Sequence, residues 1–350
     1  MPQAEAQTQA NHTAVPPAAP ASRMSGPLAA GVAARVGQAV VGQEVALERL
    51  MIALLTGGHV LLEGVPGLAK TLLVQTLASA VELDFARVQF TIDLLPGDLT
   101  GSEILDPRTN DFRTRRGPVF TNLLLADEIN RAAPKVQSAL LEAMQERRVT
   151  IGNETHNLPV PFVVVATQNP VEQAGTFELP EAQLDRFLLR HRLTYPKVDE
   201  EQRVLQQSLG LGLKKGGGGG EGDDEGAMPM TAFDIVGEGP VATRKQLVEA
   251  MQAVQKVHVS DVFTQHALSL VRRTRGHERL ELGASPRAGI ALVIASRARA
   301  FLHGRDYVVP EDLLDLADDV LLHRIRPTYA ALAEGWTTER VLASILDEMM

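Results

Sequence analysis

Residues 64–71 read Gly64-Val65-Pro66-Gly67-Leu68-Ala69-Lys70-Thr71 and directly follow a short apolar run, His59–Glu63. The run predicts a buried strand, and the residues from Lys70 onward predict a helix. A loop between a strand and a helix can direct successive backbone N–H groups at a phosphate, beside the positive end of the helix. Lys70 adds a positive charge for the β- and γ-phosphates, and the Thr71 hydroxyl can bind Mg²⁺. The stretch therefore predicts a nucleotide site that extends to Leu72.

The loop departs from the pattern G-x-x-x-x-G-K-[ST] at one position, where Ala69 replaces the glycine before Lys70. A second motif decides the interpretation. Leu123–Ala126 is an apolar strand candidate that ends in Asp127 and Glu128, 56 residues after Thr71. An acidic pair by itself is more often a charged helix start. After a phosphate loop, it predicts a carboxylate for Mg²⁺ at Asp127 and a general base at Glu128.

A third motif, Ala166–Pro170, also follows an apolar run. It places Asn169 where its amide could contact the attacking water or the γ-phosphate from a neighbouring strand. A turn asparagine before proline is common. The two earlier motifs favour the nucleotide-sensing role.

Strand and helix patterns alternate in the first part of the chain, which indicates βαβ units and a mainly parallel sheet. Pro134–Glu146 predicts an amphipathic helix between two of the strands. The further strand candidates are Arg87–Phe90, Leu123–Ala126, Phe162–Ala166 and Leu188–Leu193.

The chain divides into four predicted segments. Residues 1–27 are rich in Ala, Pro, Gln and Thr and predict a disordered tail. Residues 28–205 carry the strand–helix alternation and predict the α/β domain. Residues 206–240 contain a run of glycines and then acidic residues, which predicts a flexible linker or insertion. Residues 241–350 show helical periodicity only and predict a small helical domain.

The composition of the 350 residues restricts the function classes. The net charge of −9 disfavours nucleic-acid binding, which needs a basic surface. The chain has no cysteine, so disulfides, thiolate metal sites and cysteine nucleophiles are excluded. No apolar run approaches the length of a membrane helix, and no signal peptide is evident at the start. We expect a cytoplasmic protein.

Longer stretches around these motifs resemble the MoxR family of AAA+ ATPases, and the likeness spans about residues 35–330. The presence of Ala69 fits this resemblance. The stretches that carry it are Gly64–Thr71, Asp127–Ala132, Gln137–Glu146, Ala166–Pro170, Leu179–Phe187 and Ala284–Arg287.

The resemblance implies an αβα sandwich with a parallel sheet, followed by a small all-helical lid domain. It also implies a homo-oligomeric ring, usually a hexamer. In this family pattern Asn169 is the sensor 1 residue, Arg287 is the sensor 2 residue, and Val41 lies where adenine is held. Arg186 matches the arginine finger, which reaches the nucleotide of the neighbouring subunit. The alternatives for this finger are Arg131, Arg190 and Arg192.

Two inserts interrupt the expected α/β core, at residues 91–118 and 147–161. Each predicts a hairpin, around Asp106–Asn110 and Gly152-Asn153. Both resemble the inserts of the helix-2-insert AAA+ group, which also contains magnesium-chelatase subunits, replicative helicases and enhancer-binding activators. Residues 91–118 lack the Gly-Ala-Phe-Thr-Gly-Ala-type loop of the activators. A cluster of arginines in the first insert (Arg113, Arg115 and Arg116) could contact a neighbouring subunit or a substrate.

The resemblance implies ATP and Mg²⁺ as cofactors and ATP hydrolysis as the activity. MoxR relatives are thought to assist maturation of protein complexes, often with a von Willebrand factor A-domain partner, so we expect an ATP-driven remodeller of protein partners. A DNA-remodelling motor is an alternative that the acidic charge disfavours. A nucleotide-gated assembly scaffold with little turnover is another, and the presence of both Glu128 and Asn169 argues against it.

Overall fold

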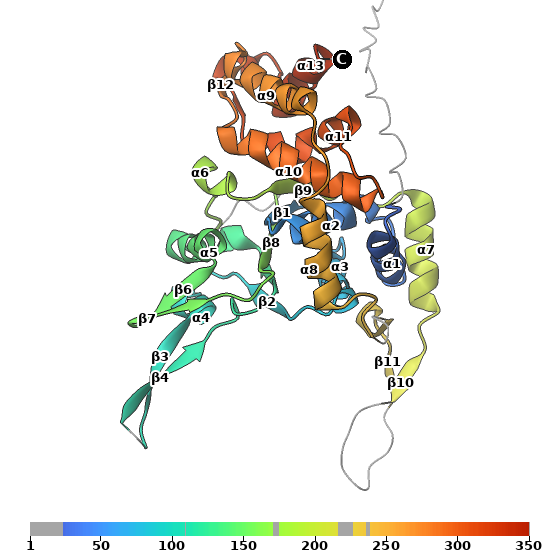
Figure 1. Cartoon of the computed structure of the whole chain (residues 1–350). Coiled ribbons are helices and arrows are strands. Elements are labelled where there is room, and N and C mark those ends of the chain that lie inside the picture. Colours follow the sequence, from blue (N-terminus) through green and yellow to red (C-terminus); the bar gives the residue numbers. More distant parts are fainter. Residues whose placement is uncertain (1–23, 109, 171–174, 216–226, 236–238, 350) are drawn as a thin grey trace, which may run out of the picture.

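The computed structural model describes residues 24–108, 110–170, 175–215, 227–235 and 239–349. Its centre is a five-stranded sheet in the order β2-β5-β8-β1-β9, in which every neighbouring pair is parallel (Figure 1). The parallel α/β fold with a helical C-terminal region is therefore confirmed. The five strands are β1 (Val60–Glu63), β2 (Phe85–Gln89), β5 (Leu123–Asp127), β8 (Val163–Gln168) and β9 (Leu189–Arg192).

The sheet has a hydrophobic core on each face, because successive residues of a strand point to opposite sides. In β5, Leu124 belongs to the core that contains α5 (Pro134–Glu146). Leu125 belongs instead to the core that contains α2 (Glu44–Thr56) and α3 (Lys70–Ala80). Figure 1 shows α5 on one side of the sheet and α2 and α3 on the other. The three central strands, β1, β5 and β8, are buried on both faces, and this is why they read as continuous apolar runs.

The two inserts form antiparallel hairpins that extend from the α5 side of the sheet (Figure 1). The first consists of α4 (Pro96–Thr100), β3 (Gly101–Asp106) and β4 (Asp111–Arg116). The second pairs β6 (Arg148–Ile151) with β7 (Glu154–Asn157).

Several elements lie outside the central sheet, the two inserts and the lid. The glycine run Gly216–Gly220 lies outside the described residues. These elements are α1 (Pro27–Val36), η1 (Ile129–Arg131), α6 (Glu181–Leu184), α7 (Val198–Leu209), β10 (Leu213–Lys215), β11 (Ala227–Pro229) and η2 (Ala232–Ile235).

The lid is mostly helical and shares the core of α2 and α3. It also contains a short antiparallel pair, β12 (Leu280–Leu282) and β13 (Arg326–Pro327), so the expectation of an all-helical lid was wrong in this detail. Strands of two or three residues are too short to show an alternating pattern in the sequence. In the described ranges, no helix has the length and apolar character to cross a bilayer. The helices are α8 (Arg244–Val254), α9 (Asp261–Gly276), α10 (Pro286–Leu302), α11 (Pro310–Leu321), α12 (Tyr329–Ala333) and α13 (Thr338–Asp347).

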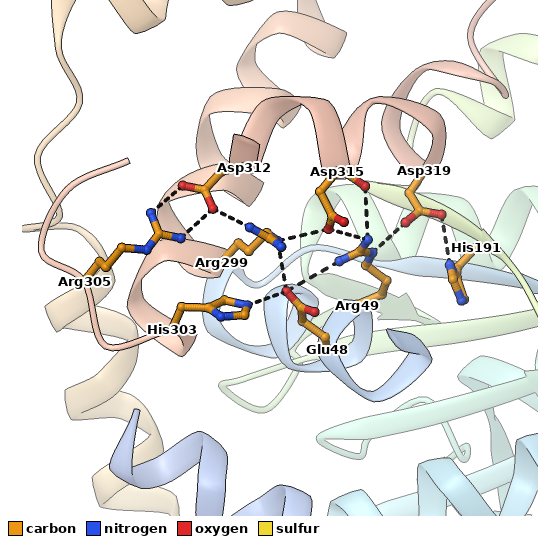
Figure 2. A network of polar contacts seen from close by, with 9 residues as sticks. All are labelled: Glu48, Arg49, His191, Arg299, His303, Arg305, Asp312, Asp315 and Asp319. Carbon is orange, nitrogen blue, oxygen red and sulfur yellow. Dashed lines mark hydrogen bonds and ion pairs between the residues drawn. The ribbon is translucent and has the colours of Figure 1, made fainter. Parts of the chain in front are cut away.

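A network of ion pairs joins the lid to α2 and β9 (Figure 2). Arg49 of α2 donates from Nε to Asp319 at 2.6 Å and from a terminal nitrogen to Asp315 at 2.7 Å. On the other side of Asp319, the ring of His191 lies 2.9 Å from its Oδ1. The network therefore connects a sheet strand, a helix beneath the lid and lid helix α11.

Asp312 is the most buried carboxylate of this network, with a side chain that is 0% exposed. It accepts hydrogen bonds from Arg299 at 2.6 Å, from Arg305 at 2.6 and 2.8 Å, and from the Val309 amide at 2.9 Å. Burial alone would raise the pKa of Asp312, but these hydrogen bonds outweigh burial and lower it. The carboxylate is thus charged at neutral pH, and the stability it contributes is lost only as pH falls through this lowered pKa.

We expect Asp312→Ala to lower the free energy of unfolding by about 3–5 kcal/mol, because the largely buried guanidinium of Arg299 loses its closest carboxylate. Urea unfolding followed by circular dichroism would measure the change. Glu311→Ala, at an exposed position of the same helix turn, is the control and should cost less than about 1 kcal/mol. Equal losses in the two variants would contradict the assigned importance of the buried network.

Candidate active site

The predicted phosphate loop lies between the end of β1 and the first turn of α3. Gly67 has a φ of 89°, a left-handed conformation that favours glycine. Ala69 also has a positive φ of 54° and directly precedes α3, so this alanine is held in a conformation that glycine would adopt more easily. In the described structure no side chain caps the N-terminus of α3, so its first amides can serve a phosphate.

The residues around the loop divide into anchoring and exposed groups. Leu68 and Leu72 are buried, so the predicted contact of Leu72 with the nucleotide could come only from its backbone. Pro66 and Gly67 are exposed, and Val65 and Thr71 are partly exposed. The side chains of the loop therefore fix it to the core while its crest faces outward.

Lys70 points back over the loop. Its Nζ donates a hydrogen bond to the Gly64 carbonyl at 2.7 Å. Burial lowers the pKa of Lys70, although the negative charges of Asp127 and Glu128 oppose that shift. The lysine is therefore close enough to the acidic pair for their charges to influence one another.

The acidic pair stands at the end of β5 and is held by side chains of both neighbouring strands. Asp127 accepts from the Thr167 hydroxyl at 2.6 Å and from Arg87 at 2.7 Å. Glu128 accepts from Gln89 at 2.7 Å and pairs with Arg131 at 3.0 Å. The two carboxylate groups thus have separate side-chain partners.

Asn169 follows β8, which lies between β5 and β1. It is buried, with 6% of its surface exposed. Because these three strands are parallel neighbours, the phosphate loop, Asn169 and the acidic pair all lie at the carboxyl edge of the sheet.

Val41 lies in the turn between α1 and α2. The next residue, Gly42, is left-handed with a φ of 77°, and a Cβ there would lie 2.8 Å from a carboxylate oxygen of Glu200. The start of α7 therefore packs against the turn predicted to hold adenine.

The donor set at this edge fits Mg²⁺. The Asp127 carboxylate and the Thr71 hydroxyl are hard oxygen ligands, which this ion prefers. No group of three or more His, Asp or Glu side chains suited to a metal occurs among the described residues. A Mg²⁺ ion held by one carboxylate would take its remaining ligands from nucleotide phosphates and water.

Sequence reasoning missed Arg87, Gln89 and Thr167. Arg87 and Gln89 are two residues apart at the end of β2, so they share the face of the strand beside Asp127 and Glu128. A polar pair at such a strand end is a usable signal only once β2 is known to neighbour β5. Thr167 lies inside the Asn169 motif and could have been noticed there.

The structure places Arg186 and Arg287 at the other edge of the sheet. Leu188, two residues after Arg186, donates its amide to the His59 carbonyl, just before β1 begins. Ser285, the N-cap of α10, donates to Asp185 at 3.1 Å, which brings the first turn of this helix and Arg287 to the same edge. Four strand residues span about 13 Å, so both arginines lie well away from the phosphate loop of their own chain.

The arginine candidates differ in their partners. Arg190 pairs with Glu63 at 2.7 Å, and Arg192 bridges Glu63 and Glu339, the latter at 2.6 Å. Arg131 pairs with Glu128. The side chains of Arg186 and Arg287 make no hydrogen bond or ion pair within the part of the chain described. This difference favours Arg186 over the other finger candidates.

Comparison with known proteins agrees with this geometry. Residues 59–189 match the family model described as "ATPase family associated with various cellular activities (AAA)", and residues 272–345 match the model of the AAA lid domain. A crystal structure of a candidate ATPase from Cytophaga hutchinsonii superposes with a TM-score of 0.78 at 42% identity, covering 90% of this chain and 92% of that chain.

The sequence relatives are similar along most of their length. The chain is 42% identical to Chaperone MoxR1 of Mycobacterium tuberculosis, covering 89% of this chain and 79% of that protein. It is also 42% identical to the uncharacterized protein YeaC of Bacillus subtilis, covering 91% and 93% respectively. Protein MoxR of Methylorubrum extorquens is 32% identical, covering 84% and 87%. The chain belongs to the MoxR family of AAA+ ATPases.

Proposed function

We propose that this chain binds ATP with Mg²⁺, hydrolyses it to ADP and phosphate, and uses the cycle to remodel partner protein complexes. The observation that carries the proposal is the shared carboxyl edge of β1, β8 and β5. A lysine, two carboxylates and a buried asparagine meet there beside an uncapped helix N-terminus.

Each residue of this edge has a distinct task in the proposed reaction. Lys70 exchanges its bond with the Gly64 carbonyl for a phosphate oxygen, and the first amides of α3 bind further oxygens. Thr71 and Asp127 would hold Mg²⁺, and the bound ion would neutralise phosphate charge. Glu128 accepts a proton from the attacking water, and Asn169 orients that water or the γ-phosphate.

The site is incomplete in one chain. Phosphoryl transfer spreads negative charge over the equatorial oxygens, and a guanidinium there accelerates the reaction. Arg186 and Arg287 stand at the amino edge of the sheet, so we infer that they serve the nucleotide of a neighbouring copy. Such a head-to-tail contact closes into a ring, and we propose a hexamer from the family resemblance.

The proposed substrate is protein. The net charge of −9 disfavours nucleic acid. The β3–β4 hairpin exposes Ile104, Leu105 and Phe112, the last with 68% of its surface accessible, and such apolar side chains suit a protein contact. The similarity to a protein named as a chaperone supports the same reading. A von Willebrand factor A-domain protein is the partner class that the family resemblance suggests.

Lys70→Ala should abolish or severely weaken ATP binding, because the loop loses its positive charge for the phosphates. Titration calorimetry with ATP and Mg²⁺ would measure this. Unchanged affinity would show that residues 64–71 do not form the phosphate site.

Glu128→Gln should bind ATP but hydrolyse it slowly, since an amide keeps the shape and cannot take a proton. Loss of a general base costs about 10²–10⁴-fold in rate. A coupled ATPase assay measures turnover, and a binding titration serves as its control. Near-normal turnover would assign the base to another residue.

Arg186→Ala should bind ATP and lose about 10³–10⁵-fold in turnover, because the transferred phosphoryl group loses its guanidinium. Mixing it with Lys70→Ala should restore part of the activity, since an intact Lys70 site then meets an intact Arg186. The ATPase rate is measured against mixing ratio, with assembly followed by light scattering. Arg272→Ala, at an exposed position of α9, is the control and should be normal.

Normal turnover in Arg186→Ala would transfer the finger role to Arg131, Arg190 or Arg192. No recovery on mixing, despite verified subunit exchange, would contradict independent sites completed by a neighbour.

A further inference from the structure

Thr167 joins the two carboxylate residues of the site through one hydroxyl. Its Oγ1 donates to Asp127 Oδ1 at 2.6 Å and accepts from the Glu128 backbone amide at 2.9 Å. The residue is 1% exposed, so water does not compete for either bond. A hydroxyl can donate one hydrogen bond and accept others at the same time, and both capacities are used here.

The bond to the Glu128 amide acts on an unusual backbone. Glu128 has a φ of 57°, in the left-handed region that side chains other than glycine rarely adopt. Such conformations persist where the surroundings enforce them, and they concentrate at functional sites. The hydrogen bond from the Glu128 amide to Thr167 helps to enforce this conformation, because it fixes the peptide group between Asp127 and Glu128.

The bond to Asp127 acts on the metal-binding candidate. Thr167 holds one carboxylate oxygen, and Arg87 holds the other at 2.7 Å. The carboxylate is therefore oriented from both neighbouring strands, by β8 on one side and β2 on the other. Residues that orient a metal-binding carboxylate affect metal affinity and activity although they do not touch the metal.

We propose that Thr167 is a positioning residue for the reaction. Its hydroxyl orients Asp127 toward Mg²⁺ and locks the backbone that presents Glu128 to the attacking water. Thr167 lies near the end of β8 and Asn169 follows two residues later, so this segment supplies both a positioning group and the proposed sensing group. This inference rests on the proposed ATPase function.

Two pairs of variants isolate the hydroxyl. The first pair is the wild type and Thr167→Val, whose side chains have nearly the same shape and differ in the hydroxyl. The second pair is Thr167→Ser and Thr167→Ala, in which a smaller side chain is compared with and without the hydroxyl. Thr121→Val is the matched control. Thr121 is a buried threonine two residues before β5, and its Oγ1 has no hydrogen-bond partner among the described residues.

Thr167→Val and Thr167→Ala, which lack the hydroxyl, should each turn over ATP about 10–100-fold more slowly than the member of the pair that has it. Both should also need a higher Mg²⁺ concentration for half-maximal rate. The KM for ATP should change far less than kcat, because the phosphate loop is intact. Thr167→Ser should keep most of the wild-type rate, and Thr121→Val should be normal. Melting temperatures of all variants identify any loss of folding, and the Ser and Ala pair decides the case if Thr167→Val folds poorly.

The inference is overturned if turnover and Mg²⁺ requirement are the same within each pair, or if Thr167→Ser is as slow as Thr167→Ala. A wild-type chain without ATP hydrolysis would overturn the proposed function instead. The Mg²⁺ dependence of ATP binding, measured by titration, still tests the orientation of Asp127 in that case. If ATP binding depends on Mg²⁺ to the same extent in both members of each pair, the positioning role of Thr167 is rejected.

Discussion

Parallel pairing of β1, β8 and β5 is the constraint on which the site depends. Each strand runs in the same direction, so the segments that follow them emerge at one edge. The phosphate loop, Asn169 and the acidic pair occur in separate parts of the chain, and only this pairing brings them together. The same register lets a hydroxyl on β8 reach a carboxylate on β5 at 2.6 Å. A slip of one residue would turn every side chain of the strand to the opposite face.

Strand β9 links this edge to the lid through three consecutive residues. Arg190 and Arg192 both pair with Glu63, the residue that precedes the phosphate loop. Arg192 continues to Glu339 of α13, and His191 pairs with Asp319 of α11. Such ion pairs contribute little net stability, because buried ones cost desolvation and exposed ones are weakened by solvent. Their value here is geometric, since they specify how the lid sits on the sheet.

In the proposed reaction, the two edges of the sheet supply complementary parts of one reaction centre. The carboxyl edge has the phosphate loop and the acidic pair, and the amino edge has Arg186 and Arg287. Neither guanidinium group has an ion-pair partner among the described residues, and this suits a role toward another molecule. A head-to-tail arrangement of copies would unite the two halves, and it would make turnover depend on assembly.

The sequence by itself determined the contiguous features. The phosphate loop, the acidic pair, helix Pro134–Glu146 and both hairpins are local patterns, and each depends on residues close together in the chain. Contacts between strands that are distant in sequence were decided only by the tertiary structure. Thr167 bonds Asp127 across 40 residues, and Arg49 bonds Asp319 across 270. The edge of the sheet at which Arg287 lies was likewise decided by the tertiary structure. The physical reason is that these contacts depend on strand order and register, which no local propensity encodes.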